Sequence, residues 1–281
     1  MFPYHILVTL DRNYLSVLTV MLYSLTQSDS DGVFTVYIAH NSLTAEDFSN
    51  LGKTLPRTEL VDVRIPENFL ENAPVSSRYP TEMYFRLFAA QYLPQELDRI
   101  LYLDPDLVVL HSLRELYNID FQNNLFAAAS HIESRTFKEF NRLRLGLSEE
   151  THYINSGVMM MNLSLLRQEQ NRQDIFSFIE KHKNTLLLPD QDVLNALYAD
   201  RTVLIDPMIY NLGDKYLHLR NLRLPKEEHI DLDWIRTHTA VIHYYGKNKP
   251  WKDNYRGELG VFYEEFSKRL QNTQTLSLIH I

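Results

Sequence analysis

The sequence predicts an α/β protein with a mostly parallel central sheet and helices on both faces. Apolar runs of strand length, such as residues 5–10 and 99–104, alternate with segments whose leucines recur at helical spacing. These runs are continuously apolar, which is typical of parallel strands that are buried on both faces. Ligands of such sheets bind beyond the carboxyl ends of the strands, so polar residues at those ends are candidate site residues.

The first half of the chain is expected to alternate regularly between strands and helices. Strands are predicted at residues 5–10, 33–40, 59–65 and 99–104, and helices at residues 11–25, 44–55 and 81–93. Thr44 is placed to cap the second of these helices. Strands that alternate with helices in this way indicate a parallel sheet.

The pattern is less regular after residue 111. Strands are predicted at residues 123–132 and 239–246, and helices at 173–182, 190–200 and about 254–270. Residues 152–166 are predicted to form a strand that bends at Gly157 and leads into a helix. No internal repeat, low-complexity segment or linker divides the chain. A single domain over residues 1–281 is therefore expected.

The composition excludes several classes of function. The chain has 281 residues, of which 44% are hydrophobic and 23% charged, and its formal net charge is −8, so nucleic-acid binding is not expected. It has no cysteine, which excludes disulfides, thiolate metal sites and cysteine nucleophiles and fits a cytoplasmic location. Neither the N-terminal "MFPYHILVTLD" nor any other run predicts a signal peptide or a membrane span. The tail "NTQTLSLIHI" is not basic, so stable membrane attachment is not expected either.

The segment "YLDPDLVVL" (102–110) places Asp104 and Asp106 at the end of an apolar strand. Aspartate and proline are common where a strand ends in a turn, so a purely structural role is one interpretation. Two carboxylates this close repel each other unless a cation or a proton lies between them, and carboxylate oxygens favour Mg²⁺ or Mn²⁺. Pro105 favours an extended conformation of Asp104, which would fix the direction of that carboxylate.

Two kinds of enzyme use such a pair of aspartates. In one, the pair holds a divalent ion that binds the diphosphate of a nucleotide-sugar. In the other, the haloacid-dehalogenase-like phosphatases, the first aspartate is the nucleophile. These phosphatases usually carry the pair on their first strand and a second acidic motif downstream, whereas here "GDKYLH" (213–218) lacks the second acid of that motif. The phosphatase interpretation is the weaker one.

The late segment "HYYGKNKPW" (243–251) adds three candidate site residues after a predicted strand. One interpretation is a simple strand exit with solvated lysines. In the other, His243 is a third metal ligand, Gly246 lets the backbone approach a diphosphate, and Lys249 pairs with phosphate. Two carboxylates and one imidazole suit Mn²⁺ better than Ca²⁺.

Polar residues at the ends of other elements allow similar pairs of interpretations. Asp11 and Asn13 either cap the first helix or bind the edge of a nucleobase that stacks on Tyr14. The acids of "LPDQDVLNALY" (188–198) lie in the first turn of a helix, where the helix dipole favours them. The methionines of "YINSGVMMMN" (153–162) are interpreted as core residues.

The order of these segments is more specific than any one of them. The succession "VTLDRNY", "MYFRLFAAQYL", "RILYLDPDLVV", "YINSGVMMMNL", "LPDQDVLNALY" and "HYYGKNKPW" resembles glycosyltransferase family 8, the family of glycogenin and of bacterial lipooligosaccharide galactosyltransferases, over about residues 3–251. The resemblance implies a GT-A-type nucleotide-diphospho-sugar transferase fold. Residues 1–130 would form the nucleotide-binding half, 131–251 the donor-sugar and acceptor half, and 252–281 a C-terminal helix and tail. It also implies a Mn²⁺-dependent enzyme, with Mg²⁺ as the second choice, that moves glucose or galactose from a UDP-hexose to a carbohydrate-bearing acceptor and retains the anomeric configuration.

Residue by residue, the resemblance implies a complete site. The metal ligands would be Asp104, Asp106 and His243, the nucleotide and diphosphate contacts Asp11, Asn13, Tyr14, Gly246 and Lys249, and the donor-sugar contacts Arg86, Asn155, Asp190 and Gln191, of which Asp190 and Gln191 are the catalytic candidates. A non-catalytic UDP-sugar-binding module is the alternative from another class, and loss of a metal ligand or of Lys249 would indicate it; none is missing. The sequence departs from the family at residues 131–133, where "HIE" follows the strand after which members often carry an acid near the acceptor.

Overall fold

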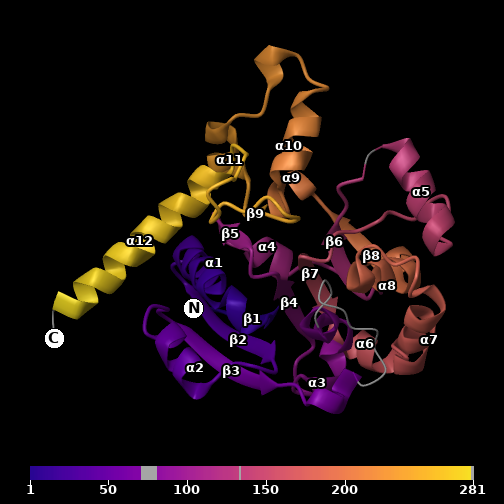
Figure 1. Ribbon diagram of the computed structural model, residues 1–281, viewed down its shortest axis with the longest axis horizontal. Coiled ribbons are helices and arrows are strands. Elements are labelled where there is room, and N and C mark those ends of the chain that lie inside the picture. Colours follow the sequence, from indigo (N-terminus) through magenta and orange to yellow (C-terminus); the bar gives the residue numbers. More distant parts are fainter. Residues whose placement is uncertain (71–80, 133, 280–281) are drawn as a thin grey trace.

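The computed structural model describes residues 1–70, 81–132 and 134–279. Within them a seven-stranded sheet forms the centre of the molecule, with the strand order β3-β2-β1-β4-β7-β6-β8 (Figure 1). Its strands are β1 (Phe2–Thr9), β2 (Gly32–His40), β3 (Thr58–Arg64), β4 (Arg99–Leu103), β6 (Phe126–Ala129), β7 (Val158–Asn162) and β8 (Thr202–Ile205). All neighbours pair in parallel except β7, which is antiparallel to both β4 and β6. The predicted mostly parallel α/β sheet is confirmed.

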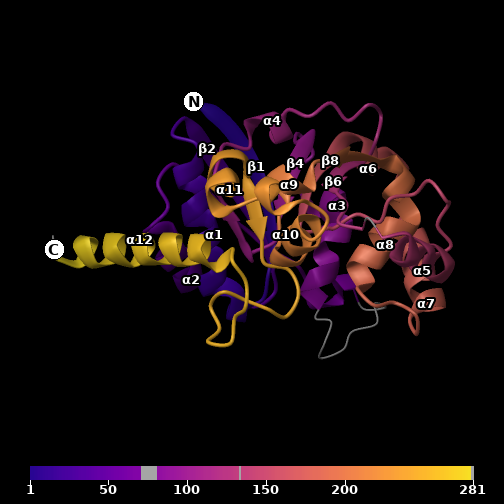
Figure 2. The same cartoon turned by 90° about the horizontal axis from the view of Figure 1, so that it is seen from above.

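Helices connect the strands and cover both faces of the sheet (Figures 1 and 2). The α-helices are α1 (Leu15–Ser28), α2 (Ala45–Gly52), α3 (Ala89–Tyr92), α4 (Arg114–Tyr117), α5 (Arg135–Leu145), α6 (Leu163–Glu169), α7 (Arg172–His182), α8 (Pro189–Tyr198), α9 (Pro207–Tyr210), α10 (Asp214–Asn221), α11 (Leu232–His238) and α12 (Gly260–Ile279). The 3₁₀ helices are η1 (Arg12–Tyr14), η2 (Glu67–Leu70), η3 (Thr81–Phe88), η4 (Ala199–Arg201) and η5 (Lys226–Glu228). The last helix, α12, runs past α1 and extends away from the rest of the molecule.

The sheet separates two apolar cores because side chains alternate along each strand. On β1, Ile6 and Val8 pack into one core with α1 and α12, and Leu7 packs into the other with η3, α3, α6, α7 and α8. On β7, Met160 and Met159 divide between the two cores in the same way, and neither has exposed surface. The methionines are core residues, as predicted.

A second, two-stranded sheet lies outside the main one and consists of β5 (Leu107–Val109) and β9 (Val241–His243). The two strands are antiparallel, with Leu107 opposite His243. The register continues beyond the strands, since the Tyr244 N–H donates to the Asp106 carbonyl at 3.0 Å. The strand predicted at residues 239–246 therefore exists, but it pairs with a short strand that the sequence did not predict.

Several other elements differ from the prediction. The helix expected at residues 81–93 is mainly the 3₁₀ helix η3, the strand at 123–132 shortens to β6, and the C-terminal helix begins at residue 260. Helix α5 was not predicted because its apolar side chains Phe137, Phe140 and Leu143 are exposed and do not mark a buried face. Thr44 does cap α2, since its hydroxyl accepts a hydrogen bond from the Asp47 N–H. The single domain over residues 1–281 stays a prediction.

A buried ion pair ties α5 to α8. Asp192 has no exposed surface, and its carboxylate accepts hydrogen bonds from two Arg144 nitrogens at 2.5 and 2.8 Å. The same carboxylate accepts from the Tyr153 hydroxyl at 2.7 Å and from the Leu187 and Leu188 N–H groups at 2.7 and 3.1 Å. One acid therefore fixes the start of α8 relative to the segment that precedes β7.

We predict that Asp192→Ala lowers the free energy of unfolding by about 3–5 kcal/mol, because it leaves Arg144 as a buried charge without its partner. The half-exposed pair between Glu139 and Arg142 provides the matched control, and Glu139→Ala should change the free energy by less than about 1 kcal/mol. Urea unfolding followed by circular dichroism measures both. Equal losses in the two variants would contradict the role given to Asp192.

Candidate functional site

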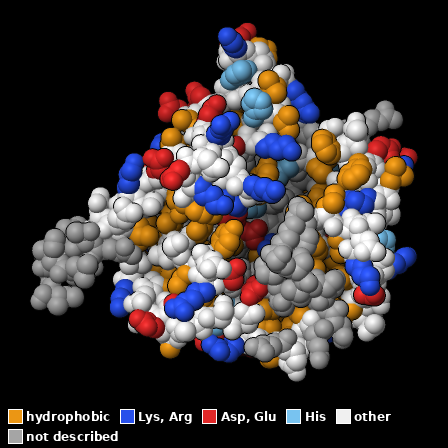
Figure 3. All heavy atoms as spheres, in the orientation of Figure 1, with side chains coloured by type: hydrophobic (Ala, Val, Ile, Leu, Met, Phe, Trp, Pro, Cys, Tyr) orange, Lys and Arg blue, Asp and Glu red, His pale blue; other side chains and the backbone are white. Residues whose placement is uncertain are grey.

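A hollow of about 220 Å³ opens at the carboxyl ends of β1 and β4. Among the predicted site residues, Asp11, Tyr14, Arg86, Asp104 and Asp106 line it. In the space-filling view, acidic side chains lie in the hollowed centre of this face, and Lys and Arg side chains lie along its upper rim (Figure 3). The hollow is at the edge of the sheet where the sequence predicted a ligand site.

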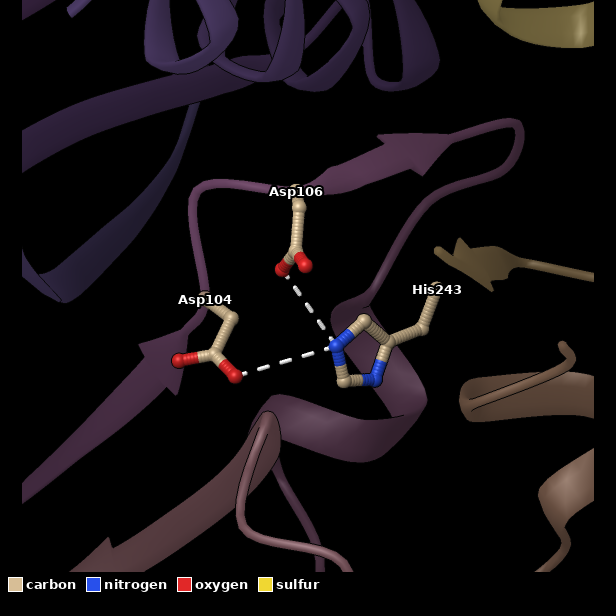
Figure 4. A group of neighbouring side chains, drawn as sticks. All are labelled: Asp104, Asp106 and His243. Atoms are coloured by element: carbon tan, nitrogen blue, oxygen red, sulfur yellow. Dashed lines mark ion pairs between the residues drawn. The ribbon is translucent and has the colours of Figure 1, made fainter. Parts of the chain in front are cut away.

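Asp104, Asp106 and His243 form one cluster, and their ligand atoms all lie within 4.8 Å of one another. His243 Nε2 is 3.3 Å from Asp106 Oδ1 and 3.7 Å from Asp104 Oδ2 (Figure 4). The two aspartates come from the turn between β4 and β5, and the histidine ends β9. The structure thus brings together the three residues that were predicted as metal ligands, although they lie far apart in the sequence.

The residues of this cluster fit a divalent cation such as Mn²⁺. Carboxylate oxygen and imidazole nitrogen are ligands that Mn²⁺ accepts. Gly157 leaves the space that the cluster needs, because a Cβ there would lie 2.2 Å from His243 Cε1 and 2.8 Å from Asp104 Oδ2. Gly157 also holds Asp104 through its carbonyl, which accepts from the Asp104 N–H at 2.8 Å. The sequence indicated a bend at this glycine, and the structure shows close approach as the reason that only glycine fits.

Asp106 is held as a carboxylate. Burial alone raises the pKa of its carboxyl, but His243 and Lys249 hold that pKa well below its usual range. The Lys249 ammonium donates hydrogen bonds to Asp106 Oδ2 and, at 2.7 Å, to the Tyr244 carbonyl, and the residue is 7% exposed. The structure therefore places Lys249 on an aspartate of the cluster, and its predicted contact with a diphosphate stays a prediction.

Arg86 joins two acids of the site. Its Nη2 lies 2.9 Å from Asp104 Oδ1 and its Nε 3.2 Å from Asp190 Oδ2. Burial disfavours the guanidinium charge, but Asp104, Tyr102 and Asp190 outweigh that effect and raise the pKa of Arg86. For Asp190, burial raises the pKa of the carboxyl, and Arg86 opposes it. Arg86 is thus a permanent buried cation that holds both carboxylates in position.

Tyr102 is a site residue that the sequence did not reveal. Its hydroxyl donates to Asp104 Oδ1 at 2.6 Å, and its ring packs under the Arg86 guanidinium, 4.4 Å from the ring centroid. The signal that indicates it is strand periodicity, since residues two apart on a strand lie on the same face. Tyr102 orients the carboxylate that follows it.

Gln191 lies beside Asn155 behind the cluster. Its Oε1 accepts from the Ser156 N–H at 3.2 Å, the Ser156 hydroxyl at 3.4 Å and Asn155 Nδ2 at 3.3 Å. These donors occupy the amide oxygen of Gln191. The structure brings together Asn155, Asp190 and Gln191, which were predicted as donor-sugar contacts. Arg86 connects this group to Asp104, because it also contacts Asp190 and donates to the Ser156 carbonyl at 3.2 Å.

The predicted nucleotide segment is only partly in the hollow. Asp11 and Tyr14 line it, whereas Asn13 is exposed and is not among the lining residues. Asp11 Oδ1 accepts from the Asn13 N–H at 2.6 Å, so Asp11 also has the capping role that was the alternative interpretation. The ring of Tyr14 meets Trp251 edge to face, at 6.3 Å between centroids. Gly246 has a φ of 84° and open space around the Cβ position, so it serves the backbone conformation.

A second hollow, of about 450 Å³, lies between α5 and α10. His131 and Tyr245 stack on its floor, 4.9 Å apart, and Tyr245 also meets the His243 ring edge to face at 5.2 Å. Phe137 and Lys215 line its sides. Burial lowers the pKa of His131 to about 4, so this ring is neutral at physiological pH. The hollow thus combines aromatic and basic side chains, and Tyr245 connects it to the metal-ligand cluster.

The fold and this site define a glycosyltransferase of the GT-A type. The crystal structure of the galactosyltransferase LgtC in complex with donor and acceptor sugar analogues has a TM-score of 0.78 to this chain, with 21% identity and coverage of 94% of this chain and 95% of that one. The glycosyltransferase GlyE of Streptococcus pneumoniae TIGR4 has a TM-score of 0.71, with 22% identity over 99% of this chain and 64% of that one. The chain belongs to glycosyl transferase family 8, whose profile matches residues 5–255.

Sequence relatives agree with this assignment. Lipopolysaccharide 1,2-glucosyltransferase of Escherichia coli is 28% identical over 250 residues, 87% of this chain and 72% of that protein. General stress protein A of Bacillus subtilis (strain 168) is 26% identical over 90% of this chain and 91% of that protein, and lipopolysaccharide 1,3-galactosyltransferase of Salmonella typhimurium is 24% identical over 86% and 71%. The predicted family is confirmed, and the phosphatase alternative is wrong. Among the described residues, no helix combines the length and the apolar character that crossing a membrane requires.

We predict that Gly157→Ala weakens binding of a divalent cation, tested with Mn²⁺, by about tenfold or more, because the added methyl group displaces His243 or Asp104. The free Mn²⁺ signal in electron paramagnetic resonance measures the affinity. Gly52→Ala is the matched control, since the nearest atom to its new methyl group is 3.8 Å away. Unchanged Mn²⁺ affinity in Gly157→Ala would show that the cluster does not need this space.

Proposed function

We propose that this protein is a Mn²⁺-dependent, retaining hexosyltransferase that moves glucose or galactose from a UDP-sugar to a glycan, glycolipid or glycoprotein acceptor. The cluster of Asp104, Asp106 and His243 beside the hollow that Tyr14 lines is the observation that carries the proposal. The lipopolysaccharide glucosyl- and galactosyltransferases among the relatives support a hexose donor. The absence of cysteine fits a reaction in the cytoplasm.

Asp104, Asp106 and His243 would hold the cation. Bound there, Mn²⁺ would act as a Lewis acid that neutralises charge on the departing diphosphate. Mg²⁺ is the second choice, because it prefers an all-oxygen set of ligands.

The residues around the cluster would bind and orient the donor. Tyr14 offers a half-buried aromatic face for uracil, with Asp11 beside it. Lys249 forms a hydrogen-bonded ion pair with Asp106. Its positive charge would therefore be near a diphosphate that binds to a cation held by Asp106. Arg86 pairs with both Asp104 and Asp190 and would keep the two carboxylates oriented.

The hydrogen bonds of Gln191 and Asp190 support attack of the acceptor on the same face from which UDP departs. A covalent intermediate needs a nucleophile on the far face of the sugar. Gln191 Oε1 already accepts from the residues 155 and 156, and Asp190 is paired with Arg86. The acceptor hydroxyl oxygen would bond to the anomeric carbon as the carbon–oxygen bond to the diphosphate breaks, and the diphosphate oxygen would take the hydroxyl proton. Asp190 and Gln191 would hold the sugar in position for this step.

The hollow between α5 and α10 is the proposed acceptor subsite. Its stacked His131 and Tyr245 provide a flat aromatic surface of the kind on which sugar rings pack, and Tyr245 contacts His243. His131 and Ile132 line it at the point where the sequence departs from the family, and Glu133 lies outside the described residues. The acceptor would therefore approach the metal-ligand cluster from the side of α10.

We predict that Asp106→Asn reduces sugar transfer and donor hydrolysis by orders of magnitude, because it removes a charged ligand from the cluster. The assay measures UDP release from UDP-glucose, UDP-galactose and their N-acetyl forms, with Mn²⁺ and with a chelator. Asp233→Asn, an exposed acid on α11, is the control and should keep full activity. Chelator-resistant activity would contradict the metal requirement, and UDP binding without turnover of any donor would indicate a non-catalytic binding module.

We predict that Tyr14→Ala weakens UDP binding by about 1–3 kcal/mol, the range for loss of one base–aromatic stack, while Tyr14→Phe keeps the ring and the affinity. Isothermal titration calorimetry with UDP measures both variants. Equal affinity of the wild-type protein for UDP and ADP would count against a pocket that recognises uracil.

A further inference from the structure

A partly buried chain of amide hydrogen bonds leads from the backbone of residue 157 to His243. Asn155 Oδ1 accepts from the Gly157 N–H at 3.0 Å and from Asn211 Nδ2 at 2.9 Å. Asn211 Oδ1 lies 2.8 Å from His243 Nδ1. Asn211 has no exposed surface, and no sequence motif pointed to it.

The fold holds Asn211 in this position through its own backbone. The Asn211 carbonyl accepts from His131 Nε2 at 2.6 Å. The next residue, Leu212, forms a parallel bridge to Ile242, and its carbonyl accepts from the His243 N–H at 2.7 Å. Leu212 is thus attached to β9 by main-chain bonds, which hold the backbone of Asn211 beside His243.

The direction of each hydrogen bond in the chain follows from its first donor. A backbone N–H can only donate, so the Asn155 atom that faces Gly157 is the carbonyl oxygen. Independent support comes from the other end of that amide, where Asn155 Nδ2 faces Gln191 Oε1. Since Asn155 Oδ1 can only accept, the Asn211 atom that faces it is the NH₂ group. The Asn211 atom that faces His243 is then the oxygen, and His243 Nδ1 carries the hydrogen.

A neutral imidazole with its hydrogen on Nδ1 has its lone pair on Nε2. Nε2 is the atom that faces Asp106 Oδ1 at 3.3 Å and Asp104 Oδ2 at 3.7 Å. In the neutral ring, a lone pair that faces two carboxylates is repelled by both unless a metal ion lies among them; a proton in that place instead makes the ring the cation that lowers the pKa of Asp106. The chain of amides therefore selects the form of His243 that is suited to bind a metal and unsuited to hydrogen-bond its acidic neighbours.

We infer that Asn211, oriented by Asn155, is a positioning residue that holds His243 in the Nδ1–H tautomer and so prepares Nε2 to bind the cation. The inference rests on the proposed role of His243 as a metal ligand, but it also makes a statement about the protein without metal. Partners of this kind, which lie behind the metal ligands, typically change metal affinity by about 10–100-fold. Asn211 would act through His243 and touch neither the metal nor the substrate.

The first experiment measures the Mn²⁺ affinity of three variants by isothermal titration calorimetry and by the electron paramagnetic resonance signal of free Mn²⁺. Asn211→Leu, similar in size but unable to accept from Nδ1, should bind Mn²⁺ about 10–100-fold more weakly than the wild type. Asn211→Asp keeps an oxygen that accepts from Nδ1 and should bind Mn²⁺ much more tightly than Asn211→Leu. Asn221→Leu is the matched control, because the Asn221 amide makes a comparable donor and acceptor pair of bonds with Ile230 outside the site, and Mn²⁺ affinity should not change.

The second experiment reads the tautomer directly. Long-range ¹H–¹⁵N spectra of the metal-free wild-type protein, recorded where the ring is neutral and assigned with His243→Gln, should show hydrogen on Nδ1 and none on Nε2. Hydrogen on Nε2 in this spectrum would overturn the inference. It would also be overturned if Asn211→Leu bound Mn²⁺ as tightly as the wild type, or if Asn211→Asp bound Mn²⁺ no more tightly than Asn211→Leu. If Asn211→Leu does not fold, the inference is tested by the Mn²⁺ affinity of Asn211→Asp and by the tautomer that the spectra show. If the wild type shows the Nδ1–H form but binds no Mn²⁺, the inference on the tautomer stands and the proposed metal dependence fails.

Discussion

The antiparallel pairing of β5 with β9 is the constraint on which the site depends. The two strands contribute three residues each, yet their register places His243 opposite Leu107, directly beside the turn that carries both aspartates. A bond from the Tyr244 N–H to the Asp106 carbonyl extends that register, and a bond from the His243 N–H to the Leu212 carbonyl holds the other edge of β9. Because side chains alternate along a strand, a shift of this register by one residue would turn His243 to the opposite face and separate it from the aspartates.

Two cations from other segments balance the acids of the site. Asp106 receives Lys249 from the segment that follows β9, and Asp104 and Asp190 share Arg86 from η3. A buried carboxylate without a partner is strongly destabilising, whereas each acid here has a cation in contact. The protein can therefore hold a concentrated set of acids at the edge of its sheet, with backbone and cations together opposing their repulsion.

Much of the fold and part of the site could be predicted from the sequence. The parallel strands were visible as apolar runs, and Asp104 and Asp106 as a polar interruption at the end of one of them. The segment "HYYGKNKPW" made His243 a candidate ligand, but only the resemblance to a family favoured that role, because nothing local in "VIHYY" distinguishes a ligand from a buried histidine. Asn211 was not reachable, since its role exists only once Leu212 bridges to β9. Asn13, placed in the site by the resemblance, is exposed and is not among the residues that line the hollow, so its contact with a nucleobase stays a prediction.

The distance along the chain between the two halves of the cluster has a consequence for synthesis. The aspartates leave the ribosome with β4, but His243 and Lys249 follow more than a hundred residues later. At translation rates of roughly 5–20 residues per second, the interval is on the order of ten seconds. During it the nascent chain carries the acids, Arg86 and most of the main sheet without the strand that closes the site. The growing chain is thus unable to form the complete ligand cluster until β9 has emerged, long after the aspartates themselves.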